Sequence, residues 1–134
     1  MINWTKFYLG IAKLFAEQSK DPRLQVGCVI VTSGGAMFPG YNGWAIGEQD
    51  IPDSLEPGQS GAVHGEQNSI CRFDPSINKG SKMYLTSSPC VVCARLIVNC
   101  QAIDEVYYLD EYRDTRGIKI LEDSGIKCKK YVEE

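Results

Sequence analysis

Two short motifs in this chain combine residue types that bind metal ions and move protons. Cys90 and Cys93 are three positions apart, so on a helix their side chains point the same way. His64 is the only histidine of the chain, and Glu66 follows two residues later. Two thiolates and one imidazole fill three positions of a tetrahedral zinc ion and leave the fourth open, as in catalytic zinc sites. The motifs predict a zinc centre with Glu66 beside it as the group that moves protons.

Each motif also has an ordinary structural interpretation. A Cys-x-x-Cys pair is as often a redox pair or two core thiols as half of a zinc site, and a lone histidine more often serves packing. Their conjunction favours zinc, because both motifs fall at the predicted start of a helix, where the helix dipole lowers the pKa of a thiol. Ser88 and Pro89 before Cys90 are typical of such a helix start.

The elements that must position these motifs alternate in a regular order. Apolar residues at three- and four-residue steps predict helices, and β-branched runs bounded by turn residues predict strands. The helices are expected at 5–19, 63–73, 90–99 and 115–123, and the strands at 24–32, 36–41, 82–86, 104–109 and 126–132. This order predicts an α/β fold, a three-layer α/β/α sandwich with a mixed five-stranded sheet. Both motifs then follow the carboxyl ends of strands, where such sheets bind ligands.

Length and composition fit one folded domain spanning residues 1–134. Basic residues number 14 and acidic residues 17, so the net charge of −3 does not favour binding to nucleic acid. The sequence shows neither a secretory signal pattern nor an apolar run long enough for a membrane. We therefore expect a cytoplasmic protein that binds no nucleic acid and no membrane. There, the six cysteines are expected to be free thiols or metal ligands.

Three further stretches accompany the two motifs: residues 20–27 (KDPRLQVG), residues 40–43 (GYNG) and residues 107–117. Together they make almost the whole chain resemble the zinc-dependent cytidine and deoxycytidylate deaminase superfamily, and within it the deoxycytidylate (dCMP) deaminases. In this family, water activated by zinc attacks C4 of cytosine, a glutamate shuttles protons, and ammonia leaves. The resemblance implies that dCMP is converted to dUMP, which feeds thymidylate synthesis.

The resemblance also implies a role for individual residues. The Zn²⁺ ligands would be His64, Cys90 and Cys93, and Glu66 the proton shuttle. The residues that match the family's contacts to the cytosine ring, its amine and the sugar are Gly65, Ser88 and Asn42, although the family usually has alanine in place of Gly65. A nucleotide phosphate must be met by cations or hydrogen-bond donors. The candidates for that contact are Lys20, Arg23, Tyr112 and Arg113.

Regulation is a further expectation from the resemblance. Many dCMP deaminases are homo-oligomers, typically hexamers, that dCTP activates and dTTP inhibits, each together with Mg²⁺. A match would place that site on the glycine-rich loop at 42–61 and on the second helix. The residues expected there are Gly43, Gly47, Glu48 and Asn68. The ordinary interpretation of the loop is a flexible surface segment.

Two classes of alternative remain open. The first is another deaminase of the same fold, acting on tRNA adenosine, cytosine or a riboflavin precursor; the acidic net charge argues against the tRNA enzyme. The second is a non-catalytic nucleotide-sensing module in which zinc only holds the helices together. Glu66 argues against it, since a structural metal site has no use for an unliganded carboxylate.

Overall fold

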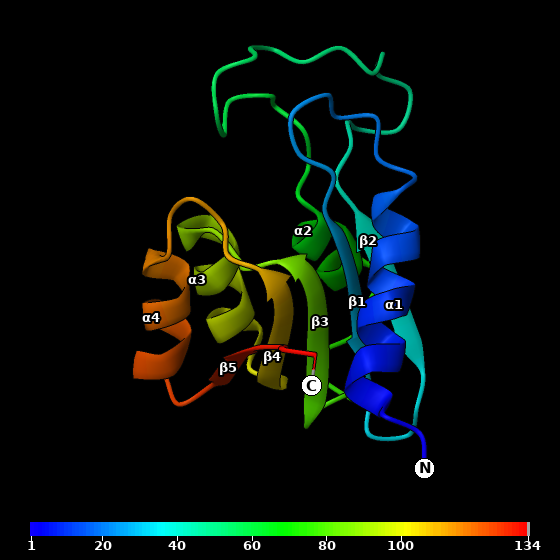
Figure 1. Ribbon diagram of the computed structural model, residues 1–134, viewed down its shortest axis with the longest axis vertical. Coiled ribbons are helices and arrows are strands. Elements are labelled where there is room, and N and C mark those ends of the chain that lie inside the picture. Colours follow the sequence, from blue (N-terminus) through cyan, green and yellow to red (C-terminus); the bar gives the residue numbers. More distant parts are fainter. Residues whose placement is uncertain (134) are drawn as a thin grey trace.

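The computed structural model describes residues 1–133 and contains one five-stranded sheet with four helices (Figure 1). All nine expected elements are present in the expected order. The helices are α1 (Trp4–Ala16), α2 (Gly65–Cys71), α3 (Val91–Cys100) and α4 (Arg116–Asp123). The strands are β1 (Gly27–Val31), β2 (Met37–Tyr41), β3 (Ser81–Ser87), β4 (Ile103–Asp110) and β5 (Lys127–Lys130).

The sheet is mixed, as the alternation of elements predicted. Its strand order is β2-β1-β3-β4-β5, with β1 antiparallel to β2 and β3, and with β3, β4 and β5 parallel to one another. The chain passes from β3 to β4 through α3, and from β4 to β5 through α4. The register places Cys28 opposite Leu85 and Leu85 opposite Tyr108, so one row of buried side chains crosses three strands.

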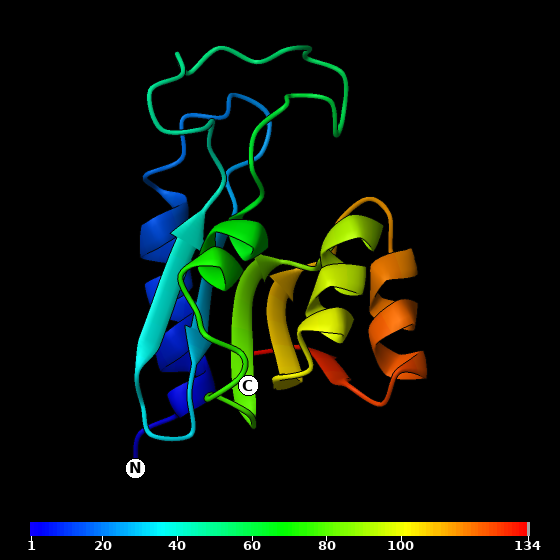
Figure 2. The same cartoon turned by 180° about the vertical axis from the view of Figure 1, so that it is seen from behind.

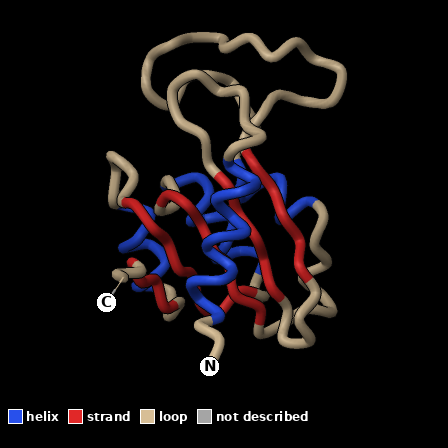
Figure 3. Tube along the Cα trace, turned by 45° about the vertical axis from the view of Figure 1, so that its right-hand side comes forward, coloured by secondary structure: helices blue, strands red, loops and turns tan. Residues whose placement is uncertain are grey.

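The helices cover the two faces unequally. The larger core cluster lies between the sheet and α2, α3 and α4, which stand in front of the sheet in Figure 2. The smaller cluster lies on the other face under α1, which crosses the sheet in Figure 3. A Cβ at Gly27 would stand 1.8 Å from the Ala12 carbonyl oxygen, so only glycine allows α1 to pack this closely on β1. The expected three layers are confirmed.

Several boundaries differ from those expected, for physical reasons. The first strand begins at Gly27 and not at residue 24, because the Leu24 carbonyl and the Val26 N–H hydrogen-bond to the side chain of Asn42 instead of to a strand. The first helix ends at Ala16, three residues before the expected end. The third helix begins at Val91, because Cys90 caps it from outside.

The long connection between β2 and α2 is ordered by contacts at its base. Gly43 and Val63 form an isolated antiparallel bridge, and the Trp44 indole N–H donates to the Ser60 carbonyl at 3.0 Å. In Figures 1 and 2 this connection stands beyond the sheet, at the end where α2 begins. Within residues 1–133, no helix is long and apolar enough to cross a membrane.

Candidate metal centre and active site

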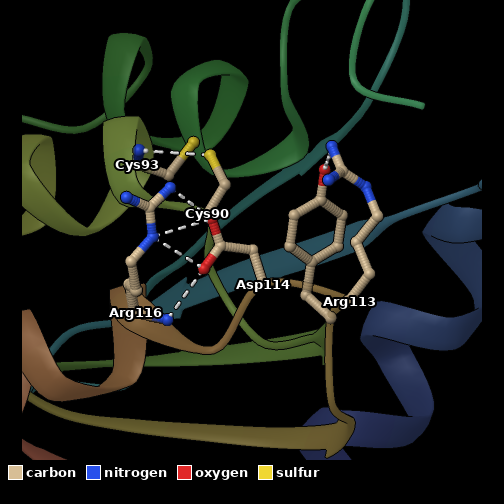
Figure 4. Close-up of polar contacts among 6 residues, drawn as sticks. Cys90, Cys93, Arg113, Asp114 and Arg116 are labelled. Atoms are coloured by element: carbon tan, nitrogen blue, oxygen red, sulfur yellow. Dashed lines mark hydrogen bonds and ion pairs between the residues drawn. The ribbon is translucent and has the colours of Figure 1, made fainter. Parts of the chain in front are cut away.

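The starts of α2 and α3 carry the two motifs found in the sequence. His64 is the N-cap of α2 and Cys90 the N-cap of α3, each with the extended backbone that an N-cap residue adopts. The His64 N–H donates to the Gln67 side chain at 2.8 Å, which fixes the beginning of α2. The Cys93 N–H donates to Cys90 Sγ at 3.5 Å (Figure 4). Capping hydrogen bonds between backbone N–H groups and side chains therefore fix both helix starts.

The three predicted ligands converge on one point. His64 Nδ1 lies 3.2 Å from Cys93 Sγ and 3.5 Å from Cys90 Sγ, and all three ligand atoms lie within 4.8 Å of one another. A tetrahedral zinc ion with bonds of about 2.1–2.3 Å separates its ligand atoms by roughly 3.3–3.8 Å. In the described part of the chain, this is the one group of three potential ligands placed so closely. Its donor set and spacing fit Zn²⁺.

The electrostatics of these side chains favour a cation. Hydrogen bonds from Cys93 and from the His64 ring together lower the pKa of Cys90 to about 4, against the opposing effect of burial. The hydrogen bond between Cys90 and Cys93, together with burial, raises the pKa of Cys93. The contact with Cys90 raises the pKa of His64 more than burial lowers it. A negative sulfur thus faces an imidazole ring at neutral pH.

Glu66 lies beside this group in the first turn of α2. Its residue is only 4% exposed, and burial raises the pKa of its carboxyl group to about 7. It is not one of the three clustered ligands. A buried carboxyl group that titrates near neutral pH next to a metal site is suited to accept and donate protons.

A cavity of about 590 Å³ opens over this centre. Its wall includes His64, Glu66 and Cys90, with the ends of β3 and β4 and the connection at 21–26. The volume is within the range of small-molecule sites. The cavity therefore lies at the carboxyl ends of β3 and β4, beside both motifs.

Most of the predicted substrate-binding residues line this cavity. Those that do are Asn42, Gly65, Ser88, Arg23, Tyr112 and Arg113, while Lys20 is outside its lining. Lys20 Nζ is instead 3.4 Å from Asp50 in an exposed ion pair. The Ser88 N–H donates to the Asp110 carbonyl at 2.9 Å, and Ser88 Oγ accepts from the Tyr112 N–H at 2.8 Å. Ser88 therefore links the end of β3 to the segment after β4.

Arg23, Tyr112 and Arg113 form the mouth of the cavity together with residues 56–58. Arg113 Nη2 donates to the Tyr112 hydroxyl at 3.0 Å, and its guanidinium lies 5.0 Å from the centre of the Tyr112 ring. Arg23 Nη1 donates to the Leu55 carbonyl at 2.8 Å. Asp114 pairs with Arg116 at 2.7 Å and does not pair with Arg113 (Figure 4). Two guanidinium groups thus stand at the opening.

Part of the long connection also lines the cavity, which the sequence did not indicate. The lining residues from this part are Glu56, Pro57, Gly58, Ser60, Gly61 and Ala62. Gly58 has a positive φ of 75°, and a Cβ there would stand 2.5 Å from Arg113 Nη2. The Pro57-Gly58 pair predicts a turn from the sequence, but it does not indicate that this turn lies against Arg113.

The residues expected to regulate lie outside the lining of the cavity. Glu48 Oε1 accepts from the Ala45 N–H at 2.9 Å and closes a turn that contains Gly47. The Asn68 side chain donates to the Tyr41 carbonyl at 2.8 Å, so it ties α2 to β2. Gly43 forms the bridge to Val63 described above.

Comparison with known proteins gives consistent matches. The family model "Cytidine and deoxycytidylate deaminase zinc-binding region" matches residues 2–110. Human deoxycytidylate deaminase is 29% identical over 144 residues, covering 98% of this chain and 81% of the relative. The Mycobacterium phage D29 deoxycytidylate deaminase is 33% identical over 124 residues, covering 81% and 96%. The crystal structure of the cyanophage S-TIM5 dCMP deaminase in complex with dCMP and dUMP has a TM-score of 0.84 at 32% identity, covering 98% and 99%.

Proposed function

This chain belongs to the cytidine and deoxycytidylate deaminase family, and we propose that it acts as one domain that hydrolyses dCMP to dUMP and ammonia. The observation that carries the proposal is the convergence of His64, Cys90 and Cys93 on one point, with Glu66 buried in the same cavity. Both relatives named above are deoxycytidylate deaminases, and the solved relative holds the substrate and product of this reaction.

The roles of the residues follow from their positions. His64, Cys90 and Cys93 would hold zinc, which supplies Lewis-acid activation of water at neutral pH when bound. Glu66 takes a proton from the attacking water and passes it to the amino group that leaves as ammonia. Its raised pKa, about 7, lets one carboxyl group do both. Because the residue is only 4% exposed, little bulk water reaches its carboxyl group.

Selectivity for the monophosphate is assigned to the mouth of the cavity. Arg23 and Arg113 each present a guanidinium group there, and Tyr112 adds a hydroxyl group. Charge-assisted hydrogen bonds from arginine to phosphate are stronger than bonds between neutral groups. Lys20 is outside this lining and is paired with Asp50, so we assign it no phosphate contact.

The test is ammonia release from the zinc-loaded protein given deoxycytidine, dCMP and dCTP separately. We expect dCMP to be the best substrate by at least about tenfold, because only it places a single phosphate at the two arginines. Equal turnover of deoxycytidine would contradict the role of the mouth. If none of the three substrates releases ammonia, another deaminase of this fold or a nucleotide sensor would be favoured.

We further propose regulation by dCTP and dTTP with Mg²⁺ at Gly43, Gly47, Glu48 and Asn68. The support is that the connection between β2 and α2 carries Gly43, Gly47 and Glu48 as well as residues that line the cavity, and that Asn68 lies in the helix that follows it. Adding each triphosphate with Mg²⁺ to the assay tests it. Stimulation by dCTP and inhibition by dTTP are expected, and Glu48→Ala should weaken both.

Association into a homo-oligomer, a hexamer by the family pattern, is also proposed. Trp4, Phe7 and Leu14 repeat at steps of three and seven residues on the outer side of α1, and they are 54%, 49% and 61% exposed. Such a stripe is typical of a helix that packs against another chain. Light scattering should give a mass several times 14.9 kDa, and Phe7→Glu should lower it.

A further inference from the structure

The metal centre joins two helices that rest on different parts of the molecule. His64 and Glu66 lie at the start of α2, which packs on β1 and β2. Cys90 and Cys93 lie at the start of α3, which packs on α4 (Figure 2). The distance between the two pairs therefore depends on how closely each helix approaches its own support. At each support stands a buried glycine that is outside the lining of the cavity.

Gly40 is the close contact beneath α2. It is buried on β2, opposite Cys28 of β1. A Cβ at Gly40 would stand 2.6 Å from both the Gly65 carbonyl oxygen and the Ser69 backbone nitrogen, and 2.8 Å from Ser69 Oγ. These atoms belong to the turn of α2 that contains Glu66. Because non-bonded atoms do not pack this closely, a methyl group at Gly40 must lift or tilt that turn.

The face of α2 that meets this contact consists of small residues. Gly65 and Ser69 are four positions apart, so they lie on the same side of the helix. Ser69 is fully buried, and its Oγ lies 3.4 Å from the Cys28 carbonyl oxygen. A helix that rests on backbone atoms and one hydroxyl group has no long side chain that could absorb a change in spacing. The height of α2 above the sheet, and with it the depth of Glu66 in the cavity, therefore depends on the missing side chain at Gly40.

Gly117 is the corresponding contact behind α3. It is buried in the first turn of α4. A Cβ at Gly117 would stand 2.9 Å from the Cys90 carbonyl oxygen and closer still to the Pro89 carbonyl oxygen. The Cys90 carbonyl accepts the Ala94 N–H at 2.8 Å and so begins α3. A methyl group at Gly117 must therefore move the backbone that carries the Cys90 ligand.

We propose that Gly40 and Gly117 are positioning residues for the metal centre: Gly40 fixes the start of α2, and Gly117 fixes the start of α3. Neither lines the cavity, so each acts only through the helix start that rests against it. The inference rests on the proposed zinc-dependent deamination for its effect on turnover, while its effect on metal binding depends only on the ligand set. Disturbing the groups that hold metal ligands in place typically lowers metal affinity about 10- to 100-fold.

The first measurement is zinc affinity, by competition with a chromogenic zinc chelator. We expect the Kd for zinc to rise at least about tenfold in Gly40→Ala and in Gly117→Ala. The matched controls are Gly34→Ala, in the turn before β2, and Gly10→Ala, within α1. A Cβ at Gly34 would stand 3.9 Å from its nearest neighbour, and one at Gly10 would meet nothing within 4 Å, so both controls should stay within about twofold of the wild type. Unchanged zinc affinity in either test variant overturns the proposal for that glycine.

The second measurement, the visible absorption of bound Co²⁺, separates positioning from a loss of stability. The bands of Co²⁺ in a tetrahedral site with sulfur and nitrogen ligands depend on the angles between those ligands. At saturating Co²⁺, Gly40→Ala and Gly117→Ala should show shifted bands, while the two control variants should reproduce the wild-type spectrum. A glycine needed only for stability would lower the Tm and leave the spectrum of the folded protein unchanged, and this result overturns the proposal.

A milder variant tests the α2 half if Gly40→Ala does not fold. Ser69→Thr adds one methyl group to the fully buried side chain that Gly40 faces, so it should raise the Kd for zinc several-fold. Ser76→Thr, in an exposed turn, is its control and should leave the Kd unchanged. An unchanged Kd in Ser69→Thr then overturns the proposal for Gly40. A Gly117→Ala protein that does not fold would show a role in the fold as a whole and would overturn positioning at that glycine.

Turnover is the last readout. At saturating zinc, Gly40→Ala should lower kcat on dCMP about tenfold or more with little change in KM, because Glu66 moves with α2 while Arg23 and Arg113 stay in place. An unchanged kcat would contradict the placement of Glu66 by Gly40. A wild type that binds zinc in the expected way but does not deaminate dCMP would refute the proposed function and leave the positioning role standing.

Discussion

The two ends of the active-site cavity are built in different ways. At the metal end, His64 and Cys90 cap two helices, and Cys93 and Glu66 are buried against the core. At the mouth, Arg23 and Arg113 lie on irregular segments and are exposed. At the metal end, backbone N–H groups at two helix starts donate to the side chains of Gln67 and Cys90, whereas the mouth is held by a few contacts between irregular segments.

The two ends of the cavity therefore serve different tasks: the metal end carries out the reaction, and the mouth selects the substrate. Metal binding and proton transfer need ligand atoms fixed to within about 0.5 Å, which helix termini on a packed sheet provide. Recognition of a phosphate tolerates more movement, because guanidinium groups reach their partner through long side chains. Changes at the metal end should therefore abolish the reaction, and changes at the mouth should alter which substrate is used.

The largest effect is expected from Cys93→Ala at the metal end. Cys93 is fully buried and contributes one of the three clustered ligand atoms, so its loss should remove zinc, activity and stability together. We expect no detectable turnover and a Tm lowered by roughly 10 °C. Metal analysis and thermal unfolding measure both. Cys100→Ala, at the far end of α3, is the control and should keep its zinc; stoichiometric zinc in Cys93→Ala would refute the ligand set.

The next effect is expected at the mouth from Arg113→Ala. Losing charge-assisted hydrogen bonds of about 1.5–3 kcal/mol should lower kcat/KM on dCMP about 10- to 100-fold. Turnover of deoxycytidine, which has no phosphate, should change by less than about twofold. Arg116→Ala is the control, because Arg116 is paired with Asp114. Equal losses on the two substrates would mean that Arg113 does not contact the phosphate.

A smaller effect is expected from Gly58→Ala, on the other side of the mouth. Gly58 combines a φ of 75° with a close approach to Arg113 Nη2, so a methyl group both strains the backbone and displaces the guanidinium. We expect KM for dCMP to rise several-fold while zinc content is unchanged. Gly125→Ala has a similar φ of 83° but nothing within 4 Å of the new Cβ. It should cost similar stability, about 1 kcal/mol, without raising KM.

The smallest effect is expected outside the cavity, at Glu105 on β4. Hydrogen bonds from Tyr107 and Lys82 and the charge of Lys127 lower the pKa of Glu105, so its contacts stabilise the fold above the ordinary pKa and are lost as the pH falls through the lowered one. Glu105→Gln should reduce the free energy of unfolding by less than about 1 kcal/mol at pH 7. Urea unfolding at pH 7 and near pH 3 should show this difference shrinking at the lower pH, with activity unaffected. A difference that grows in acid would contradict the sign.

The metal end was predictable from the sequence, and the reasons are local. Cys90 and Cys93 need only helical spacing to converge, and His64 is the only histidine, so few arrangements remain. The sheet followed in the same way from the regular alternation of strands and helices, each with a clear hydrophobic period. These patterns depend on neighbours in the chain, which a sequence displays directly.

The mouth was only partly predictable, because it depends on how loops fold back. Lys20 and Arg23 both carry a positive charge and are three residues apart, yet only Arg23 lines the cavity and Lys20 pairs with Asp50. Residues 56–58 and 60–62 line the same cavity, although no hydrophobic period in that segment indicates which way its side chains point. The glycine at position 65 is likewise explained only by the folded structure, since a Cβ there would stand 3.2 Å from the Val26 carbonyl oxygen.

The most direct test of the central claim compares the wild type with Glu66→Gln, measuring bound zinc and dUMP formed from dCMP on the same samples. Because Glu66 is not one of the clustered ligands, both proteins should hold one zinc ion per chain. The variant should form dUMP about 10²- to 10⁴-fold more slowly, the range for loss of a general acid–base group. Equal rates of dUMP formation, or a wild type that turns over dCMP without bound zinc, would contradict the account.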